Sequence, residues 1–346
     1  MHQLESAEIE DPCQRTAPEQ RPTMNALEPR PVPRPLALLM AVVLGIFYLD
    51  AFVVGASGAE LVAFILLGVL TVVGFLQHAD HGPHRWPAAQ PIVLGALGAS
   101  AVQALGRGEL LAIVPATALV GSLGALLERR TGAVSLAAPL YCGAFAGMTS
   151  KLVLHHPGWL MLAGGLAGAV LTLLSNSWGG IGGKLGTTAF LSVFGICGLA
   201  WAFGALGPGA PLHAFSAAER VGVVIAAVSS PLLTHWLSER CALGPIQGSA
   251  LPSLLVGLLL PLLAAPLGIT PQPLALVWLG SSFVGMTAHA RLGRHPQGVL
   301  MVMGLLFALF SLSFEPRLAG IGGDLGATAA VSVFAVLGAR RLLKRA

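Results

Sequence analysis

The sequence predicts an all-α, polytopic integral membrane protein with about 12 transmembrane helices. Composition is the first reason, because 55% of the residues are hydrophobic and only 10% are charged, whereas soluble domains carry about 25% charged residues. The mean hydropathy of +0.79 agrees with this. So few charges cannot give a folded chain of this length a hydrated surface, which excludes a soluble enzyme, a disordered protein and a nucleic-acid binder.

The second reason is a series of twelve apolar segments separated by Gly, Pro, His and Arg. Backbone amides in lipid must pair within their own segment, so we expect helices. A β-barrel would alternate apolar and polar residues, and stretches such as LVAFILLGVLTVVGFL do not. The segments are 37–55, 58–77, 90–105, 109–127, 133–150, 159–176, 184–203, 219–237, 248–266, 272–289, 297–313 and 320–340.

The third reason is the distribution of Lys and Arg, which cytoplasmic loops hold in excess. With the N-terminus inside, 14 of the 19 basic residues fall on the cytoplasmic side and 4 outside. This bias supports twelve spans in an inner (plasma) membrane with both termini cytoplasmic. The inside residues are Arg15, Arg21, Arg30, Arg34, Arg85, Arg129, Arg130, Arg240, Arg291, Arg294, Arg340, Arg341, Lys344 and Arg345; the outside residues are Arg107, Lys151, Arg220 and Arg317; Lys184 begins a helix and is set apart.

Residues 1–36 come before the apolar segments and are polar and proline-rich. Such a composition cannot bury a core, so it predicts a disordered cytoplasmic tail. A cleavable signal is not expected, because no short apolar core with a small-residue cleavage site lies at the N-terminus.

An internal repeat is visible in the second half of the chain. Residues 181–194 read IGGKLGTTAFLSVF and residues 321–334 read IGGDLGATAAVSVF, and ten of the fourteen positions are identical. Shared glycine-rich composition would not reproduce the Thr, Ser and Phe positions or the other matches in the same order. These matches are Gly147-Met148-Thr149 with Gly285-Met286-Thr287, His156-Pro157 with His295-Pro296, and Leu119-Val120-Gly121 with Leu255-Val256-Gly257.

The repeat predicts how the chain is organised. Five predicted spans separate each pair of partners, and since five is odd, the two copies should face opposite ways across the bilayer. We expect two N-terminal helices in 37–78, a first repeat of five helices in 90–204 and an inverted second repeat in 219–343. Inverted repeats are typical of secondary transporters and also occur in channels.

Glycine-rich segments precede the seventh and twelfth predicted helices. Glycine allows positive φ and close backbone approach, and a helix that starts after it presents unpaired N–H groups. Gly182, Gly183, Gly322 and Gly323 are therefore candidate substrate- or ion-binding residues, around a solvated pocket between the copies. The alternative is that these glycines belong to GxxxG faces that pack helices and bind nothing.

Lys184 and Asp324 occupy the same position of the two copies with opposite charge. A Lys beside helix-start amides favours an anion, whereas an acid there favours a cation or a proton. Asp324 is thus a candidate coupling residue, and Asp50, in the first predicted helix, is a second one. The alternative is that Lys184 and Asp324 are interfacial charges, with Asp324 complementing its helix dipole.

Polar side chains near these helix starts complete the candidate site. Spaced four apart, hydroxyls share one helix face and would line a path, or they would bond back to a carbonyl one turn earlier, which is commoner. The candidates are Thr187, Thr188, Ser192, Thr328, Ser332, Thr149, Thr287 and Asn176.

Enzyme, cofactor and metal chemistry are not expected. His78, His81 and His84 with Asp80 lie in a loop that Gly and Pro interrupt, and the four cysteines form no CxxC pair. No nucleophile, nucleotide or haem motif is present, and no pair of carboxylates lies in the spans. We therefore predict no catalytic residue, no metal site and no cofactor.

The predicted function is a membrane transporter or permease for a small polar or ionic solute, with alternating access between the repeats and Asp324 coupling transport to a proton or cation. A passive channel on the same repeat and a non-transporting membrane scaffold are the alternatives. The expected partners are the lipid bilayer and a small-molecule or ion substrate, with a homo-oligomer as a further option and no nucleic acid.

Overall fold

The computed structural model is helical, and within the residues that it describes six helices are long and apolar enough to cross a membrane. The residues that the structure describes belong to one compact unit, Val32–Ala346. The structure describes positions 42 and 45, both helical, and residues 58–78, 88–107, 110–132, 135–210, 213–264, 266, 268–313 and 320–344. The predicted tail 1–36 and most of the segment 37–55 lie outside these residues.

Every predicted apolar segment from 58–77 onward overlaps one long helix of the structure. A four-residue helix, α11, is added between two of them. The helices are α2 (Gly58–His78), α3 (Ala89–Arg107), α4 (Ile113–Thr131), α5 (Ala137–Gly147), α6 (Pro157–Leu173), α7 (Lys184–Ala202), α8 (Ala217–Glu239), α9 (Gly244–Ala264), α10 (Pro271–Gly285), α11 (His289–Leu292), α12 (Pro296–Ser313) and α13 (Asp324–Leu343). The six candidate spans are α3, α7, α8, α9, α12 and α13.

Two helices are clearly shorter than the sequence predicts. The predicted segment 133–150 contains only the 11 residues of α5, and 272–289 contains only the 15 residues of α10. At 1.5 Å per residue α5 is about 16 Å long, roughly half the hydrocarbon thickness. Both helices end at the glycine of a Gly-Met-Thr sequence, and the residues that follow bond to other parts of the chain instead of continuing the helix.

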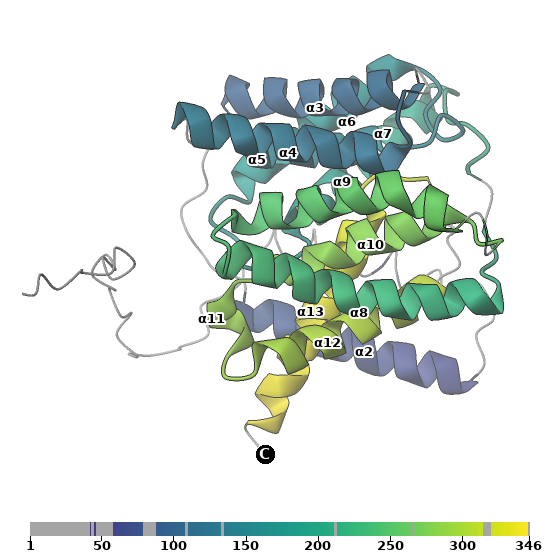
Figure 1. Ribbon diagram of the computed structural model, residues 1–346. Helices are drawn as coiled ribbons and strands as arrows, with labels where there is room; N and C mark the ends of the chain where they lie inside the picture. Colours follow the sequence, from purple (N-terminus) through teal and green to yellow (C-terminus); the bar gives the residue numbers. More distant parts are fainter. Residues whose placement is uncertain are drawn as a thin grey trace, which may run out of the picture. The chain divides into compact units, whose positions relative to one another are not determined.

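Ten of the helices form two sets with the same internal neighbours. In the first set, α3 packs on α5 and α6, α4 packs on α5, and α7 packs on α6. In the second set, α8 packs on α10 and α12, α9 packs on α10, and α13 packs on α12. The helix α2 packs on α13, and Figure 1 shows α8 and α9 side by side. We call α3–α7 the first set and α8–α10, α12 and α13 the second set.

Glycine allows close helix packing in both sets. A Cβ on Gly164 of α6 would lie 2.5 Å from the carbonyl oxygen of Gly95 on α3. In the second set, a Cβ on Gly304 of α12 would lie 2.3 Å from the carbonyl oxygen of Ala227 on α8. Membrane helices gain much of their association energy from such close backbone contact, because lipid offers no hydrophobic drive between helices.

The two sets meet along α4 and α9, which run antiparallel. Near the C-terminal end of α4, the Arg129 guanidinium donates a hydrogen bond to the carbonyl of Ala242, just before α9. Near the N-terminal end of α4, the ring of Pro115 touches Gly257, well inside α9. The start of one helix therefore lies beside a later part of the other.

Apolar side chains cover the outside of the molecule, and hydroxyls lie inside it. On α9 the outer face carries Leu258, Leu262 and Leu263, and Leu262 is 73% exposed. Soluble monomers rarely expose apolar surface of this extent. The buried polar residues are mostly Ser and Thr, which can bond to helix carbonyls without charge. This distribution is that of a membrane-embedded helical protein.

Candidate functional site

Two glycine-rich bends open the helices α7 and α13. We call residues 179–183 the first bend and residues 320–323 the second bend. Gly183 and Gly323 stand directly before the two helices with φ values of 84° and 90°. A side chain is strained at such φ values and glycine is not, so glycine lets each chain turn straight into a helix.

The helices α7 and α13 touch each other in their first turns. A Cβ on Gly186 would lie 2.5 Å from the Cα of Gly326, and a Cβ on Gly326 would lie 2.3 Å from the Cα of Gly186. Real Cβ atoms essentially never approach this closely. The two backbones are therefore in direct contact, as expected for a GxxxG packing face, and a solute would have to bind beside this contact instead of within it.

The two helices run antiparallel through this contact. Gly183, which precedes α7, lies against Ala330 in the second turn of α13. Gly323, which precedes α13, lies against Phe190 in the second turn of α7. Each helix start thus faces a later turn of the other helix, so α7 and α13 leave the crossing in opposite directions.

Each bend is held by the Gly-Met-Thr end of the other set. The N–H of Gly322 in the second bend donates to the Thr149 hydroxyl of the first set, at 3.0 Å. The N–H of Gly182 in the first bend donates to the Thr287 hydroxyl of the second set, at 3.2 Å. The two bonds join the same residue types at matching positions of the two sets, and all four residues are buried.

A second pair of bonds repeats this exchange through the main chain. The N–H of Ser150 donates to the carbonyl of Gly320 at 2.8 Å, and the N–H of Ala288 donates to the carbonyl of Gly180 at 3.0 Å. Ser150 and Ala288 each follow the Gly-Met-Thr threonine of their set. The early ends of α5 and α10 therefore have a structural reason, because the chain leaves the helix to bind the opposite bend.

Long side chains from α3 and α8 support the two Gly-Met-Thr ends. Gln103 Nε2 donates to the carbonyl of Gly147 at 2.5 Å and also reaches the carbonyl of the following threonine. In the second set, the His235 side chain interacts with the main-chain groups of Gly285 and Thr287. Gln and His are different residues that serve the same helix ends in the two sets.

Three aromatic rings fill the space where α5 and α10 meet. The ring centroids of Phe145 and Phe283 are 4.8 Å apart, and those of Tyr141 and Phe145 are 4.2 Å apart. Phe145 and Phe283 are equivalent positions of the two sets, each two residues before its Gly-Met-Thr glycine. The pair therefore lies on the boundary between the sets, next to both bends.

A chain of buried hydroxyls begins at one of these rings. Tyr141 Oη lies 3.4 Å from the Ser249 hydroxyl on α9, which lies 2.6 Å from the Ser282 hydroxyl on α10. All three residues are fully buried. Sequence reasoning missed this cluster; the one signal was that Tyr141 is one of only two tyrosines in the chain and stands in an apolar segment.

Lys184 and Asp324 lie in the first turns of α7 and α13, and no ion pair joins them within the described part of the chain. The Lys184 ammonium donates to the carbonyls of Ser177 and Ser175, at 2.6 and 3.3 Å. The Asp324 carboxylate accepts from the N–H of Leu325 at 2.7 Å. Both charges are therefore engaged by main-chain groups close to their own bends.

The predicted hydroxyls on α7 and α13 lie as expected for the commoner alternative, because each bonds to the carbonyl one turn earlier. Thr187 also reaches across the crossing to the carbonyl of Gly326, at 3.3 Å. Asn176 lies in the turn between α6 and the first bend. The bonds run from Thr187 to Gly183, Thr188 to Lys184, Ser192 to Thr188, Thr328 to Asp324 and Ser332 to Thr328.

A cavity of about 420 Å³ opens beside α7 and reaches the second bend at Ile321. Phe194 and Trp201 of α7 line it together with Val153 and residues 206–209. Hydrogen bonds between the segments around Val153 and Gly207 hold its rim, one of them 2.9 Å long. The cavity is largely apolar and lies on the side that the charge distribution predicts to be outside.

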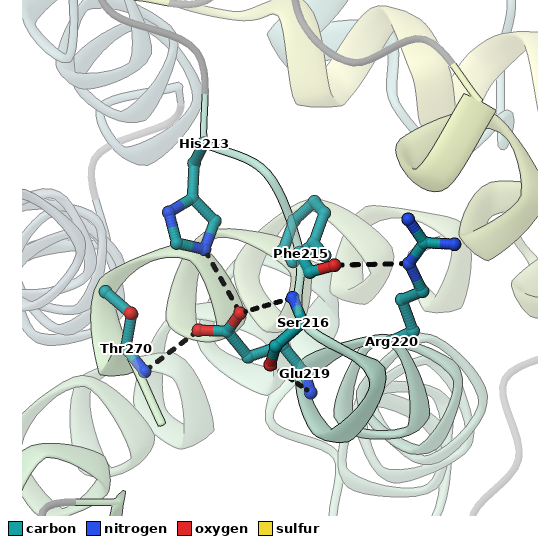
Figure 2. A network of polar contacts seen from close by, with 6 residues as sticks. All are labelled: His213, Phe215, Ser216, Glu219, Arg220 and Thr270. Carbon is teal, nitrogen blue, oxygen red and sulfur yellow. Dashed lines mark hydrogen bonds and ion pairs between the residues drawn. The ribbon is translucent and has the colours of Figure 1, made fainter. Parts of the chain in front are cut away.

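A separate polar network ties the starts of α8 and α10 (Figure 2). The Glu219 carboxylate accepts from the N–H groups of Ser216 at 2.8 Å and Thr270 at 3.0 Å, and His213 Nε2 lies 3.4 Å from it. The Ser216 hydroxyl caps α8 by accepting from the N–H of Glu219 at 3.3 Å. This capping box satisfies N–H groups at the start of α8, and the Glu219 carboxylate also holds the residue before α10, so the two helix starts lie side by side.

Some predicted residues lie outside the described part of the chain. They include Asp50, His81 and His84. Within the described residues, no group of three or more His, Cys, Asp or Glu residues could hold a metal ion, and Cys142, Cys197 and Cys241 are free thiols.

Comparison of the chain with protein-family models, with curated proteins and with solved structures found no match in any of the three.

Proposed function

We propose that the chain is a membrane transporter for a small polar solute, built as two N-terminal helices followed by a five-plus-five inverted repeat. The observation that carries this proposal is the antiparallel crossing of α7 and α13, in which each bend binds the Gly-Met-Thr end of the other set. Two helices related in this way, and α4 with α9 likewise, are what a two-fold axis in the membrane plane would produce.

The reciprocal bonds supply a physical basis for alternating access. The Gly322–Thr149 contact and the Gly182–Thr287 contact are chemically the same, so breaking either one has a similar energetic cost. In the proposal, a state that opens one contact opens the site to one side, and a state that opens the other opens it to the opposite side. Two states of similar energy are what a carrier needs.

Two alternatives have support of their own. The direct contact of Gly186 with Gly326 favours a scaffold, because it fills the space that a solvated pocket would occupy. The uncharged hydroxyls between the sets favour a passive channel, because a neutral path requires no coupling residue. Asp324 as a proton or cation coupler therefore belongs to the carrier version of the proposal alone.

Site-directed labelling of the full chain in liposomes tests the proposal. Ser150→Cys and Ala288→Cys are introduced separately in a background without the four native cysteines, and a membrane-impermeant maleimide is added from either side. A transporter predicts labelling from opposite sides, and labelling of one position that rises as labelling of the other falls when the solute gradient is reversed.

Solute and ion flux is measured in the same liposomes, with Asp324→Asn and Lys184→Gln as variants. A carrier coupled through Asp324 loses gradient-driven uptake in Asp324→Asn, whereas a channel keeps non-saturating flux. Absence of flux for every solute, together with labelling that does not respond to any gradient, would favour the scaffold and contradict the proposal.

A further inference from the structure

Side chains of α5, α9 and α10 bring uncharged hydroxyls together between the two sets. Tyr141 comes from the first set, whereas Ser249 and Ser282 come from the second set, and their hydroxyls form one chain. Each of the three side chains is 0% exposed. Buried polar groups in a membrane protein are costly unless they serve packing or function, and these bridge the boundary at which a transporter would hold its solute.

Two buried polar atoms of the first set, on α3 and α4, have no partner within the described residues. The Ser122 hydroxyl on α4 is one of them. The preceding residue, Gly121, packs against the Tyr141 ring, since a Cβ added to it would lie 2.5 Å from that ring. Gln103 Oε1 is also buried without a partner in that part of the chain, although its Nε2 holds the end of α5. Buried groups are nearly always satisfied, so such atoms point to a ligand or an ordered water.

The three residues of the cluster carry no charge. Uncharged groups hold an ion only where several of them converge on it. These hydroxyls instead form a single chain, and Ser282 also donates to the carbonyl of Leu279 at 2.6 Å. A hydroxyl can both donate and accept, and three in a row suit a neutral molecule that carries donors and acceptors of its own.

A continuous path of contacts joins the cluster to the outer cavity. The cavity reaches Ile321, and its neighbour Gly322 packs against the carbonyl of Phe145. The Phe145 ring contacts both Phe283 and Tyr141, whose hydroxyl begins the chain. The packed Phe145–Phe283 pair therefore lies between the residues that line the cavity and the hydroxyls, and a solute would have to separate the two rings of this apolar constriction to pass.

We infer that Tyr141, Ser249 and Ser282 bind the transported solute, and that this solute is a small neutral molecule with both hydrogen-bond donors and acceptors, of the amide or polyol class. The inference rests on the proposed transport function and assigns its substrate class. Phe145 and Phe283 form the barrier that the solute passes.

The test uses the full chain in liposomes, with urea and glycerol as neutral probes and chloride, sodium and protons as ionic probes. Shrinkage after an osmotic step reports the neutral probes, and ion-selective dyes report the ions. Tyr141→Phe and Ser249→Ala each remove one hydroxyl. Ser253→Ala is the matched control, because Ser253 is also buried on α9 but bonds to its own helix at Ser249.

We expect flux of at least one neutral probe and a reduction of about tenfold in Tyr141→Phe and Ser249→Ala, which corresponds to one lost hydrogen bond to the solute. Ser253→Ala should retain the flux of the unmodified chain. Phe145→Ala, which widens the constriction, should raise the flux of the neutral probes, and this gain keeps the test valid even if a hydroxyl variant folds poorly.

Other results overturn the inference in distinguishable ways. Ion flux that Tyr141→Phe leaves unchanged and Asp324→Asn abolishes would leave the transport proposal standing and refute the neutral substrate. Neutral flux that falls equally in Ser253→Ala and Ser249→Ala would refute the assigned residues. Absence of flux for every probe would refute the substrate class together with the transport function.

Discussion

The first and second sets share the residues that bind across their boundary and differ in the residues around it. Gly182 and Thr149 have the counterparts Gly322 and Thr287, and each bend needs the same hydroxyl from the opposite set. By contrast, the position that holds Lys184 in the first repeat holds Asp324 in the second. The comparison indicates that the reciprocal glycine–threonine bonds restrict sequence change, whereas the neighbouring positions of Lys184 and Asp324 differ in charge between the sets.

A second difference concerns the helix ends. The helix α8 begins with a capping box, in which Ser216 and Glu219 satisfy each other's N–H groups, whereas α3, its counterpart, has no acidic residue in its first turn. The hydroxyl chain is also one-sided: the position equivalent to Tyr141 is Leu279. The sets are therefore similar in packing and different in polarity.

The strongest way to break the comparison is to separate the two backbones at the crossing. Gly186→Ala or Gly326→Ala places a Cβ at 2.5 Å or less from the opposite Cα, so each should lower the free energy of unfolding by about 3 kcal/mol or more. Gly198→Ala on α7 is the control, because nothing lies within 4 Å of its Cβ. Denaturant titration in mixed micelles measures the change, and a variant as stable as the control would contradict the crossing.

The reciprocal threonines offer the next largest effect. Thr149→Val and Thr287→Val each leave one buried glycine N–H without an acceptor, which costs about 1–3 kcal/mol. The two losses should be equal within about 0.5 kcal/mol if the sets are equivalent. Thr172→Val is the control, since Thr172 bonds only within α6. A large loss at one threonine and none at the other would show that the exchange operates on one side alone.

The sequence predicted the bends, and it did not predict what holds them. The repeated glycines indicated positive φ before α7 and α13, and Gly183 and Gly323 adopt it. What holds the early end of α5 could not be predicted locally, because Thr149 and Ser150 bond to the distant Gly322 and Gly320. Propensity describes neighbours in sequence, whereas this exchange joins residues more than 100 positions apart.

The hydroxyl chain could not be predicted from the sequence either, because its members are far apart along the chain. Tyr141 and Ser249 are 108 residues apart, and Ser249 and Ser282 are 33 apart. A single Ser or Tyr in an apolar helix usually bonds to its own helix, so none of them indicates a cluster alone. The predicted hydroxyls on α7 and α13 do make such local bonds, which leaves their assignment to a solute site as a prediction.

The supporting side chains of α3 and α8 should give a smaller effect that sharpens the comparison. Gln103→Leu removes a donor from the end of α5 and should cost about 1.5 kcal/mol. His235→Gln keeps a donor in the same place in the second set, so its cost should stay below about 0.5 kcal/mol. Both are measured by denaturant titration at fixed pH. Equal losses in the two variants would show that the His235 ring does more than donate to the end of α10.

The smallest expected effect tests the difference between the helix starts. Ser216→Ala removes the hydroxyl that accepts from the N–H of Glu219 and should cost about 1 kcal/mol, the usual value of an N-cap. Ser100→Ala on α3 should cost less than about 0.5 kcal/mol, because that hydroxyl only bonds back to the carbonyl of Ala96. Hydrogen exchange at the first turns of α8 and α10 localises the change, since Glu219 also holds the N–H of Thr270. Faster exchange at both starts in Ser216→Ala indicates one shared cap, whereas faster exchange at α8 alone would show that the α10 start depends on the Glu219 carboxylate independently of Ser216.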